Sequence, residues 1–346
     1  MNGSPLFTGD ARSGESEIRR FVLESDLLEA LIALPAQLFY NTGIATYVWV
    51  VTNRKAPARK GKVQLIDATS FWVPMRKSLG DKRREIPLER SRDILKILAD
   101  FRDGDTRPVT KDRKTEDVVV SRVFPTTHFG FRKITVERPL RLNFQATPER
   151  IARLDEEKAF TKLAQSKKKG AAGEKAVTEG RELQEEVRKR LGALPEPLVK
   201  DRAEFERTLD VATKKIGLKL PAPARKAVLS ALSERDETAA VCREQDGNPV
   251  PDPELRDTES VPLAETVEAF FEREVKPHVP DAWIDKAKCD PKDGQIGFVG
   301  YEINFNRYFY RYTPPRPLEE IEADIRGIEK DILEMLPEVT GGPELQ

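Results

Sequence analysis

Residues 27–51, LLEALIALPAQLFYNTGIATYVWVV, decide the fold of this chain. An aliphatic run, Leu27 to Leu34, is followed by a run of β-branched and aromatic residues, Ile44 to Val51, and Pro35 and Gly43 bound the turn between them. β-Branched and aromatic side chains favour strands over helices. The stretch therefore predicts two apolar strands joined by a short loop, with the second strand buried.

The loop between these runs combines aromatic and amide side chains. Phe39 and Tyr40 stand beside Asn41 and Thr42, where the first strand is expected to end. Proteins with α/β sheets place their ligand sites in loops at the ends of strands. We therefore expect the functional site in this loop. The alternative is that Phe39 plugs the end of the sheet as a core residue.

The flanking sequence predicts one helix and one further strand. Ser16 is a candidate N-cap for a helix that runs to Ser25, and the run from Val63 to Asp67 predicts a third strand. Three strands and one helix are too few to cover both faces of an independent sheet. We therefore expect the tail of a larger α/β sheet whose earlier strands are missing from this sequence.

Composition excludes several classes of protein. The 346 residues include 59 Lys or Arg and 59 Asp or Glu, so the net charge is zero, which argues against a wholesale polyanion binder. The two cysteines, Cys242 and Cys289, and the two histidines, His128 and His278, lack the spacing of a metal site or a disulfide framework. No apolar run approaches the roughly 20 residues that cross a bilayer. We expect a cytoplasmic protein without a metal or a membrane contact.

Two stretches of the chain are locally basic. Residues 53–63 carry only positive charges, and residues 71–86 carry Arg76, Lys77, Arg83 and Arg84 among others. Such patches can neutralise DNA phosphates without reading sequence. The alternative is a solvated loop, which is the preferred interpretation for the first stretch.

The remaining chain predicts mostly helices. Apolar spacing predicts a helix that ends before Gly104, and the alternation in residues 121–144 suggests strands. Residues 148–232 have a helical pattern that is interrupted at residues 167–173, and residues 243–260 are an extended connection. A helix over 263–275 and an irregular aromatic segment over 291–312 follow. The expected buried face of the helix before Gly104 comprises Leu88, Ile94, Leu95, Leu98 and Phe101.

The last helix begins at Pro317 and carries apolar residues at alternating spacings of three and four. Such a one-sided seam needs a partner helix, either in another chain or in this one, where Leu183, Val187 and Leu191 are candidates. The seam comprises Leu318, Ile321, Ile325, Ile328, Ile332 and Met335.

Eight motifs occur in order along nearly the whole chain. They are NGSPLF (2–7), GESEIRR (14–20), LPAQLFYNTG (34–43), GKVQLID (61–67), MRKSLG (75–80), ITVERPLRLNF (134–144), PELRD (253–257) and GYEINFNRYF (300–309). In these motifs the chain resembles the modification subunit of type I restriction-modification systems. The resemblance implies an S-adenosylmethionine-dependent, adenine-specific DNA methyltransferase that works with a DNA-reading specificity subunit and, for cleavage, a motor-nuclease subunit.

Two motifs of that family are absent from this sequence. Neither the glycine-rich cofactor loop nor the catalytic Asn-Pro-Pro-Phe motif occurs here. The resemblance therefore implies the C-terminal part of such a subunit: an α/β remnant, formed by the last strands of the methyltransferase sheet, followed by a mostly α-helical region. It also implies S-adenosylmethionine as cofactor, with the binding loop missing, and a separate N-terminal methyltransferase fragment as a possible partner.

The expected organisation has five parts. Residues 1–70 end the methyltransferase domain, 71–147 form a basic connector, 148–245 are helical, 246–312 contain a linker, a helix and the aromatic segment, and 313–346 form the amphipathic helix. By resemblance, Phe39, Tyr40, Asn41 and Thr42 contribute to a pocket for the target base, which must leave the DNA stack to be methylated. The basic residues of 71–86 contact the DNA backbone, and the terminal seam docks on the specificity subunit.

Without the upstream motif, Phe39 could bind a base but not drive methyl transfer. The chain should therefore be inactive alone. A second hypothesis is a non-catalytic assembly module that binds the specificity subunit. A third is a nucleic-acid-binding scaffold unrelated to methylation.

Overall fold

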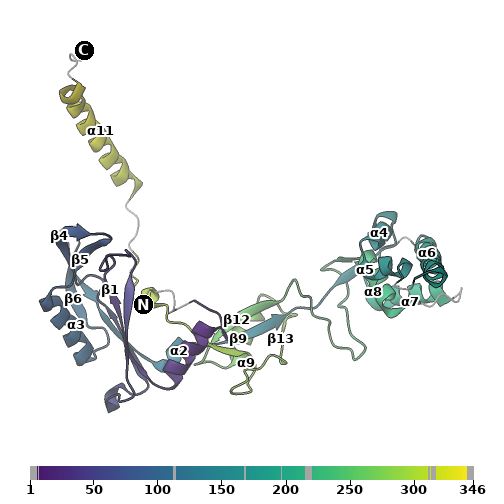
Figure 1. The fold of residues 1–346 in the computed structure, drawn as a ribbon, viewed down its shortest axis with the longest axis horizontal. Coiled ribbons are helices and arrows are strands. Elements are labelled where there is room, and N and C mark those ends of the chain that lie inside the picture. Colours follow the sequence, from purple (N-terminus) through teal and green to yellow (C-terminus); the bar gives the residue numbers. More distant parts are fainter. Residues whose placement is uncertain are drawn as a thin grey trace. The chain divides into compact units, whose positions relative to one another are not determined.

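The computed structural model describes residues 6, 8–111, 114–166, 169–195, 197–214, 220–310, 312 and 317–340. The chain forms two compact units, each built from separate segments (Figure 1). Unit 1 comprises Met1–Phe7, Asp26–Pro125 and Ile303–Gln346, and unit 2 comprises Thr8–Ser25 and Thr126–Glu302. Of the motif at residues 2–7, only Leu6 lies within the described residues. The five-part organisation stays a prediction.

Unit 1 contains a mixed four-stranded sheet in the order β2-β1-β3-β8. β1 (Leu28–Leu34) runs antiparallel to β2 (Thr46–Val51) and parallel to β3 (Lys62–Asp67), and β8 (Ser121–Pro125) runs antiparallel to β3. The three strands expected from the sequence are confirmed. The expected number of three strands was wrong, because β8 pairs with β3 on the side away from β1 and makes a fourth.

Both faces of this sheet are covered within unit 1. On one face, Ile32 and Ile66 pack with Ile94 and Ile97 of α3 (Leu88–Asp100). On the other face, Tyr47 contacts Phe305 and Phe124 contacts Tyr308, both on α10 (Phe305–Phe309). Alternate side chains of a strand point to opposite faces, and here both sets are buried in β1.

The outer edge of β2 has no partner strand in the described part of the chain. Val48 and Val51 on β2 are exposed, so the expectation that this second run forms a buried strand was wrong. The buried strand is β1. The α3 helix itself is confirmed, but Leu88 and Leu95 are exposed, and its deepest residue is Ile97.

Two hairpins and a short helix complete the first part of unit 1. The second basic stretch forms a hairpin of β4 (Val73–Leu79) and β5 (Lys82–Glu85). β6 (Thr106–Lys111) pairs with β7 (Lys114–Val119), and η1 (Pro57–Arg59) precedes β3.

Unit 2 begins with α2 (Gly14–Glu24), which confirms the first predicted helix. Its N-cap is Ser13, whose hydroxyl accepts from the Ser16 amide, so the assignment of Ser16 as the cap was wrong. Ser16 instead uses its hydroxyl to accept from the Tyr301 amide. The helix is therefore tied to β14 (Phe298–Tyr301) of its own unit.

A second sheet forms the middle of unit 2. Its central strand is β9 (Gly130–Glu137), which pairs antiparallel with β12 (Asp257–Pro262), β13 (Trp283–Ile284) and β14. The predicted alternation is confirmed, because Ile134 and Val136 are buried against α9 (Val267–Phe270) and the π-helical turn η5 (Phe271–Val275). This helix starts later than predicted, with Thr266 as its N-cap. The 3-10 helix η2 (Thr126–Phe129) leads into β9.

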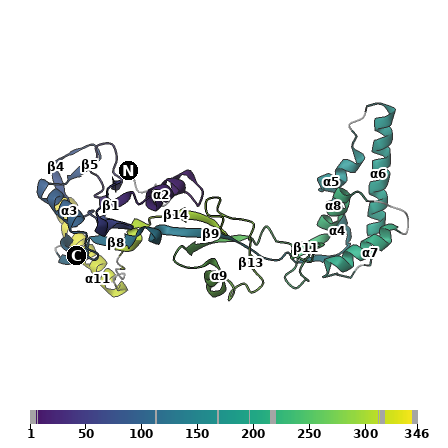
Figure 2. The same cartoon turned by 90° about the horizontal axis from the view of Figure 1, so that it is seen from below.

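The predicted helical region is confirmed as a cluster of short and long helices (Figure 2). Phe144 on β10 (Leu142–Phe144), which pairs with β11 (Ser233–Arg235), is buried in its core with Val187 and Leu191. Residues 167–168 of the predicted interruption lie outside the described residues. The helices are α4 (Pro148–Ala152), η3 (Arg153–Asp155), α5 (Lys158–Thr161), η4 (Lys162–Ala164), α6 (Ala171–Leu191), α7 (Arg202–Lys214) and α8 (Ala222–Leu232).

The last helix, α11 (Leu318–Thr340), is confirmed. The proposed pairing of its seam with Val187 and Leu191 was wrong, because both residues are buried in the core formed by the helices of residues 148–232. No described helix is both long enough and apolar enough to span a bilayer.

Candidate nucleic-acid interface

The loop between β1 and β2 has a defined backbone. Gln37 adopts a left-handed conformation with φ of 63°, and Phe39 forms an isolated antiparallel bridge with Thr42. The Thr42 hydroxyl accepts a hydrogen bond of 3.3 Å from the Ile44 amide. These contacts make a tight turn that begins where β1 ends.

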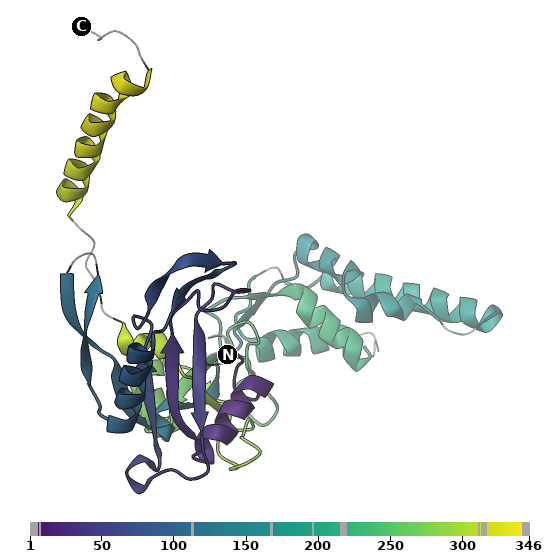
Figure 3. The same ribbon diagram turned by 60° about the vertical axis from the view of Figure 1, so that its left-hand side comes forward.

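The same loop is bonded to the β4–β5 hairpin through main-chain atoms. The Asp81 amide donates to the Tyr40 carbonyl at 3.0 Å, and the amides of Arg83 and Arg84 donate to the Gln37 carbonyl at 3.0 and 3.2 Å. Two groups of residues that we expected to contact DNA therefore lie together at one end of unit 1 (Figure 3). Nothing in the sequence indicated that they are neighbours, because more than 40 residues separate Gln37 from Arg83.

The aromatic side chains of the loop face solvent. Phe39 is 44% exposed and Tyr40 is 68% exposed, and Asn41 is also exposed. The alternative that Phe39 is a core residue was therefore wrong. An exposed aromatic ring beside an amide and a hydroxyl offers a stacking surface with hydrogen-bonding groups at its rim.

The cations of the hairpin are held without carboxylate partners. Arg76, Lys77 and Arg83 are exposed, and no carboxylate of the described residues lies within ion-pair distance of them or of Arg84. The Arg84 guanidinium lies 3.9 Å from the centre of the Trp72 ring. The hairpin thus presents positive charge that no carboxylate of the described residues neutralises, and such charge can contact phosphates. Sequence reasoning missed Trp72, although an aromatic beside a basic run is a signal that could have found it.

The first basic stretch differs from the second, because its main cations have internal partners. Lys55 is buried and donates to Asp26 and to the Lys62 carbonyl at 2.8 Å. Burial raises the pKa of Asp26, but hydrogen bonds from Lys55 and the Gly61 amide outweigh this and hold the pKa below its ordinary value. Arg59 pairs with Glu29 at 3.2 Å and stacks on Phe101. For Lys55 and Arg59, both the solvated-loop and the phosphate-contact interpretations were wrong.

The seam of α11 is solvent-exposed. Ile325 and Ile328 are each 59% exposed, and the other described seam residues are exposed or half-buried. The described residues contain no group of His, Cys, Asp or Glu side chains that could hold a metal ion. Unit 1 thus exposes an aromatic loop, a cationic hairpin and an apolar seam.

Comparison with known proteins finds a family model that matches the part of the chain containing this loop and hairpin. Residues 2–119 match the family model of the N-6 DNA methylases. The resemblance to DNA methyltransferases is thereby confirmed over this part of the chain, which includes both the aromatic loop and the hairpin.

The relatives that the chain matches are methylase subunits of type I restriction enzymes. It is 28% identical over 137 residues to the MjaIX methylase subunit of Methanocaldococcus jannaschii and 45% identical over 56 residues to the HindI methylase subunit of Haemophilus influenzae. These matches cover 39% and 16% of this chain but only 21% and 12% of the relatives. A solved type I restriction-modification methyltransferase subunit from Streptococcus thermophilus aligns with 22% identity and a TM-score of 0.27, covering 37% of this chain and 22% of that one.

Proposed function

We propose that this chain is part of a type I restriction-modification DNA methyltransferase, where it contributes to the pocket for a flipped adenine and to the docking of the specificity subunit. In this proposal Phe39 stacks on the base, with Tyr40, Asn41 and Thr42 around it, and Arg76, Lys77, Arg83 and Arg84 contact the DNA backbone. The observation that carries the proposal is the hydrogen bonding of the aromatic loop to the cationic hairpin. These bonds keep the exposed aromatic loop beside the cations of the hairpin, which supports a role for the rings in stacking on the base and for the cations in holding the strand from which it is flipped.

Methyl transfer then needs groups that the described residues do not supply. In this family the glycine-rich loop that approaches S-adenosylmethionine follows an earlier strand of the sheet, and no such loop occurs in this sequence. We therefore assign no step of the transfer to the residues present. The cofactor site and the Asn-Pro-Pro-Phe motif would come from a methyltransferase segment that acts together with this chain in the cytoplasm. The motor-nuclease subunit would join for cleavage.

Base contact is tested with the Phe39→Ala variant and fluorescent duplexes that differ only in whether the target adenine is paired. Stacking on an aromatic side chain contributes about 1–3 kcal/mol per base, so we expect roughly a 5- to 150-fold loss of affinity for the unpaired-adenine duplex. The matched control is Phe21→Ala, which removes an exposed phenylalanine from α2 in unit 2. Equal affinity of the Phe39 and Phe21 variants would remove the base-contact role.

The cofactor requirement has its own measurement. Calorimetry of the chain alone with S-adenosylmethionine should give no binding heat, and binding should appear when an N-terminal methyltransferase fragment is added. Tight binding by the chain alone would contradict the division of labour proposed here.

The exposed seam of α11 favours a second candidate, a non-catalytic assembly module that binds the specificity subunit. Both candidates predict that subunit as a partner. They differ at the aromatic loop, because a module that serves only assembly would support the complex equally well when Phe39 is replaced. Methylation that continues at the normal rate in a complex carrying Phe39→Ala would support the module.

A further inference from the structure

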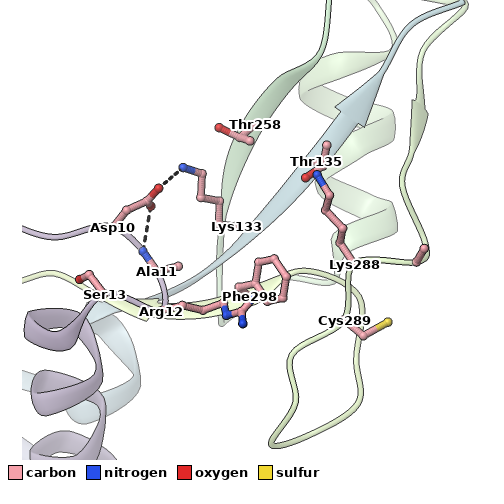
Figure 4. Close-up of a pocket in the computed structure, with 11 residues that line it drawn as sticks. Asp10, Ala11, Arg12, Ser13, Lys133, Thr135, Thr258, Lys288, Cys289 and Phe298 are labelled. Atoms are coloured by element: carbon pink, nitrogen blue, oxygen red, sulfur yellow. Dashed lines mark hydrogen bonds and ion pairs between the residues drawn. The ribbon is translucent and has the colours of Figure 1, made fainter. Parts of the chain in front are cut away.

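We infer that unit 2 carries a second DNA contact, a recess in which Arg12, Lys133 and Lys288 bind phosphate groups of the DNA backbone (Figure 4). The inference rests on the proposed function only in taking DNA as the polymer. The recess itself lies outside the aromatic loop and the hairpin of unit 1.

The recess is a broad hollow over the polar face of the second sheet. Its volume of about 850 Å³ is within the range of ligand sites. Because side chains alternate along β9, Lys133 and Thr135 lie on the face opposite to the buried Ile134. Thr258 of β12 stands across from Thr135, and Phe298 of β14 stands across from Lys133. The floor is therefore made of two hydroxyls, one cation and one aromatic ring.

The walls of the recess add positive charge from two further segments. Arg12 precedes α2 and lies 4.5 Å from the centre of the Phe298 ring, while Lys288 comes from the loop after β13. Asp10 is the single carboxylate among the lining residues, and it pairs with Lys133. Lys288 lies 3.9 Å from Asp285, which does not line the recess. Three cations against one carboxylate, with hydroxyl donors between them, suit the oxygens of a phosphodiester backbone.

A buried polar network fixes the walls to each other before any ligand arrives. Arg19 donates to the carbonyls of Tyr301, Thr8 and Gly9, which holds the segment before α2 against β14. Arg20 pairs at 2.8 Å with Asp290, whose side chain also accepts from the Val299 and Lys292 amides at 2.9 Å. Preorganised walls reduce the ordering cost of binding. This rigidity favours a binding site over a surface hollow without function.

Removal of charge should weaken DNA binding in a salt-dependent way. The test measures the affinity for a DNA duplex by fluorescence anisotropy over a range of salt concentrations. It compares the unsubstituted chain with a double variant that carries Arg12→Gln and Lys288→Gln. Each phosphate contact contributes about 0.9 to the slope of log affinity against log salt, so the slope should fall by about 2. The control is Lys286→Gln, an exposed lysine of the same loop that does not line the recess. A slope equal to that of the control would overturn the inference.

Cys289 reports directly on occupancy, because it lines the recess while the other cysteine, Cys242, is buried. Bound DNA should slow alkylation of Cys289 at low salt, and the double variant should lose this protection. Inorganic phosphate, used at the same phosphate concentration, should protect much less than DNA. Protection by phosphate with none by DNA would make this a small-anion site and would overturn the inference, as would alkylation that DNA leaves unchanged.

Failure here is distinguishable from failure of the proposed function. The recess variants should weaken paired and unpaired target duplexes equally, whereas Phe39→Ala should act on the unpaired one. The recess would be supported, and the base pocket rejected, by a combination of two results. The double variant would lose the protection of Cys289 by DNA, and Phe39→Ala would leave the affinity for the unpaired duplex unchanged.

Discussion

Gly80, at the turn of the β4–β5 hairpin, touches the main chain of Tyr40. A Cβ atom at Gly80 would lie 2.4 Å from the Tyr40 carbonyl oxygen, and Gly80 has a φ of 59°. The next amide, that of Asp81, donates to this same oxygen. The absence of a side chain at Gly80 therefore lets the hairpin hold the aromatic loop, and this dependence was not visible in the sequence.

Gly80→Ala should destabilise unit 1 and disturb the loop. The left-handed backbone alone costs an alanine about 1–2 kcal/mol, and the contact with Tyr40 adds to this cost. Gly104→Ala is the matched control, because Gly104 has a φ of 72° but open space around its Cβ position. Urea unfolding should show a larger loss of unfolding free energy for Gly80→Ala than for Gly104→Ala. Equal losses would mean that the hairpin does not constrain the loop.

The buried carboxylate of Asp290 should make unit 2 sensitive to acid. Burial opposes its ionisation, but hydrogen bonds from Arg20, Val299 and Lys292 lower the pKa to about 2. A lowered pKa contributes stability that is complete above the unfolded value of 3.8 and is lost as the pH falls through the folded value. A shift of this size corresponds to about 2 kcal/mol.

The measurement is urea unfolding at pH 6 and pH 2, followed by tryptophan fluorescence, for the full chain and for Asp290→Asn. The variant should have a lower free energy of unfolding at pH 6. The difference in this free energy between the two proteins should be about 2 kcal/mol smaller at pH 2. A difference that does not change with pH would show that Asp290 contributes through packing alone.

Two helical glycines should respond to alanine with opposite signs. A Cβ at Gly180 in α6 would lie 1.9 Å from the Leu163 carbonyl oxygen, whereas nothing lies within 4 Å of that position at Gly327 in α11. Overpacking should cost Gly180→Ala about 1–3 kcal/mol, despite the better helix propensity of alanine. Gly327→Ala should stabilise its helix by about 1 kcal/mol, seen as slower hydrogen exchange in α11. Stabilisation by both changes would contradict the close approach at Gly180.

The α11 seam should matter for assembly and not for folding. Ile325→Asp and Ile328→Asp place charges at exposed positions, so the unfolding of the isolated chain should not change by more than about 0.5 kcal/mol. Co-purification with a specificity subunit should be lost, because a buried unpaired carboxylate is costly. Leu95→Asp, at an exposed position of α3, is the control and should leave co-purification intact. Intact co-purification of the seam variants would reject the docking role.

Local patterns in the sequence predicted the elements well. The apolar runs around Pro35 gave β1 and β2, and the spacing of Ile325 and Ile328 gave α11, because periodicity within a segment reflects its own geometry. Periodicity did not say which face of α3 is buried. Ile97 lies at the centre of that face because β3 packs there, and the Gln64 side chain donates to its carbonyl at 2.9 Å.

Contacts between distant segments could not be predicted in this way. Lys55 read as part of a solvated basic run, yet its partner Asp26 lies 29 residues earlier. The recess joins Arg12, Lys133 and Lys288, which share no local pattern. Such groupings depend on strand register and loop path, which a single sequence constrains only weakly.

The interleaving of the two units affects how the chain folds during synthesis. Residues 8–25 are made before the sheet of unit 1 but wait for β14, some 280 residues later, to bind Arg19. The sheet of unit 1 in turn lacks its second cover until Phe305 and Tyr308 have left the ribosome. Unit 2 cannot be completed before β14 has emerged, and unit 1 cannot be completed before α10 has emerged. A protease that cuts once between units should therefore leave two fragments that stay associated and cannot refold apart.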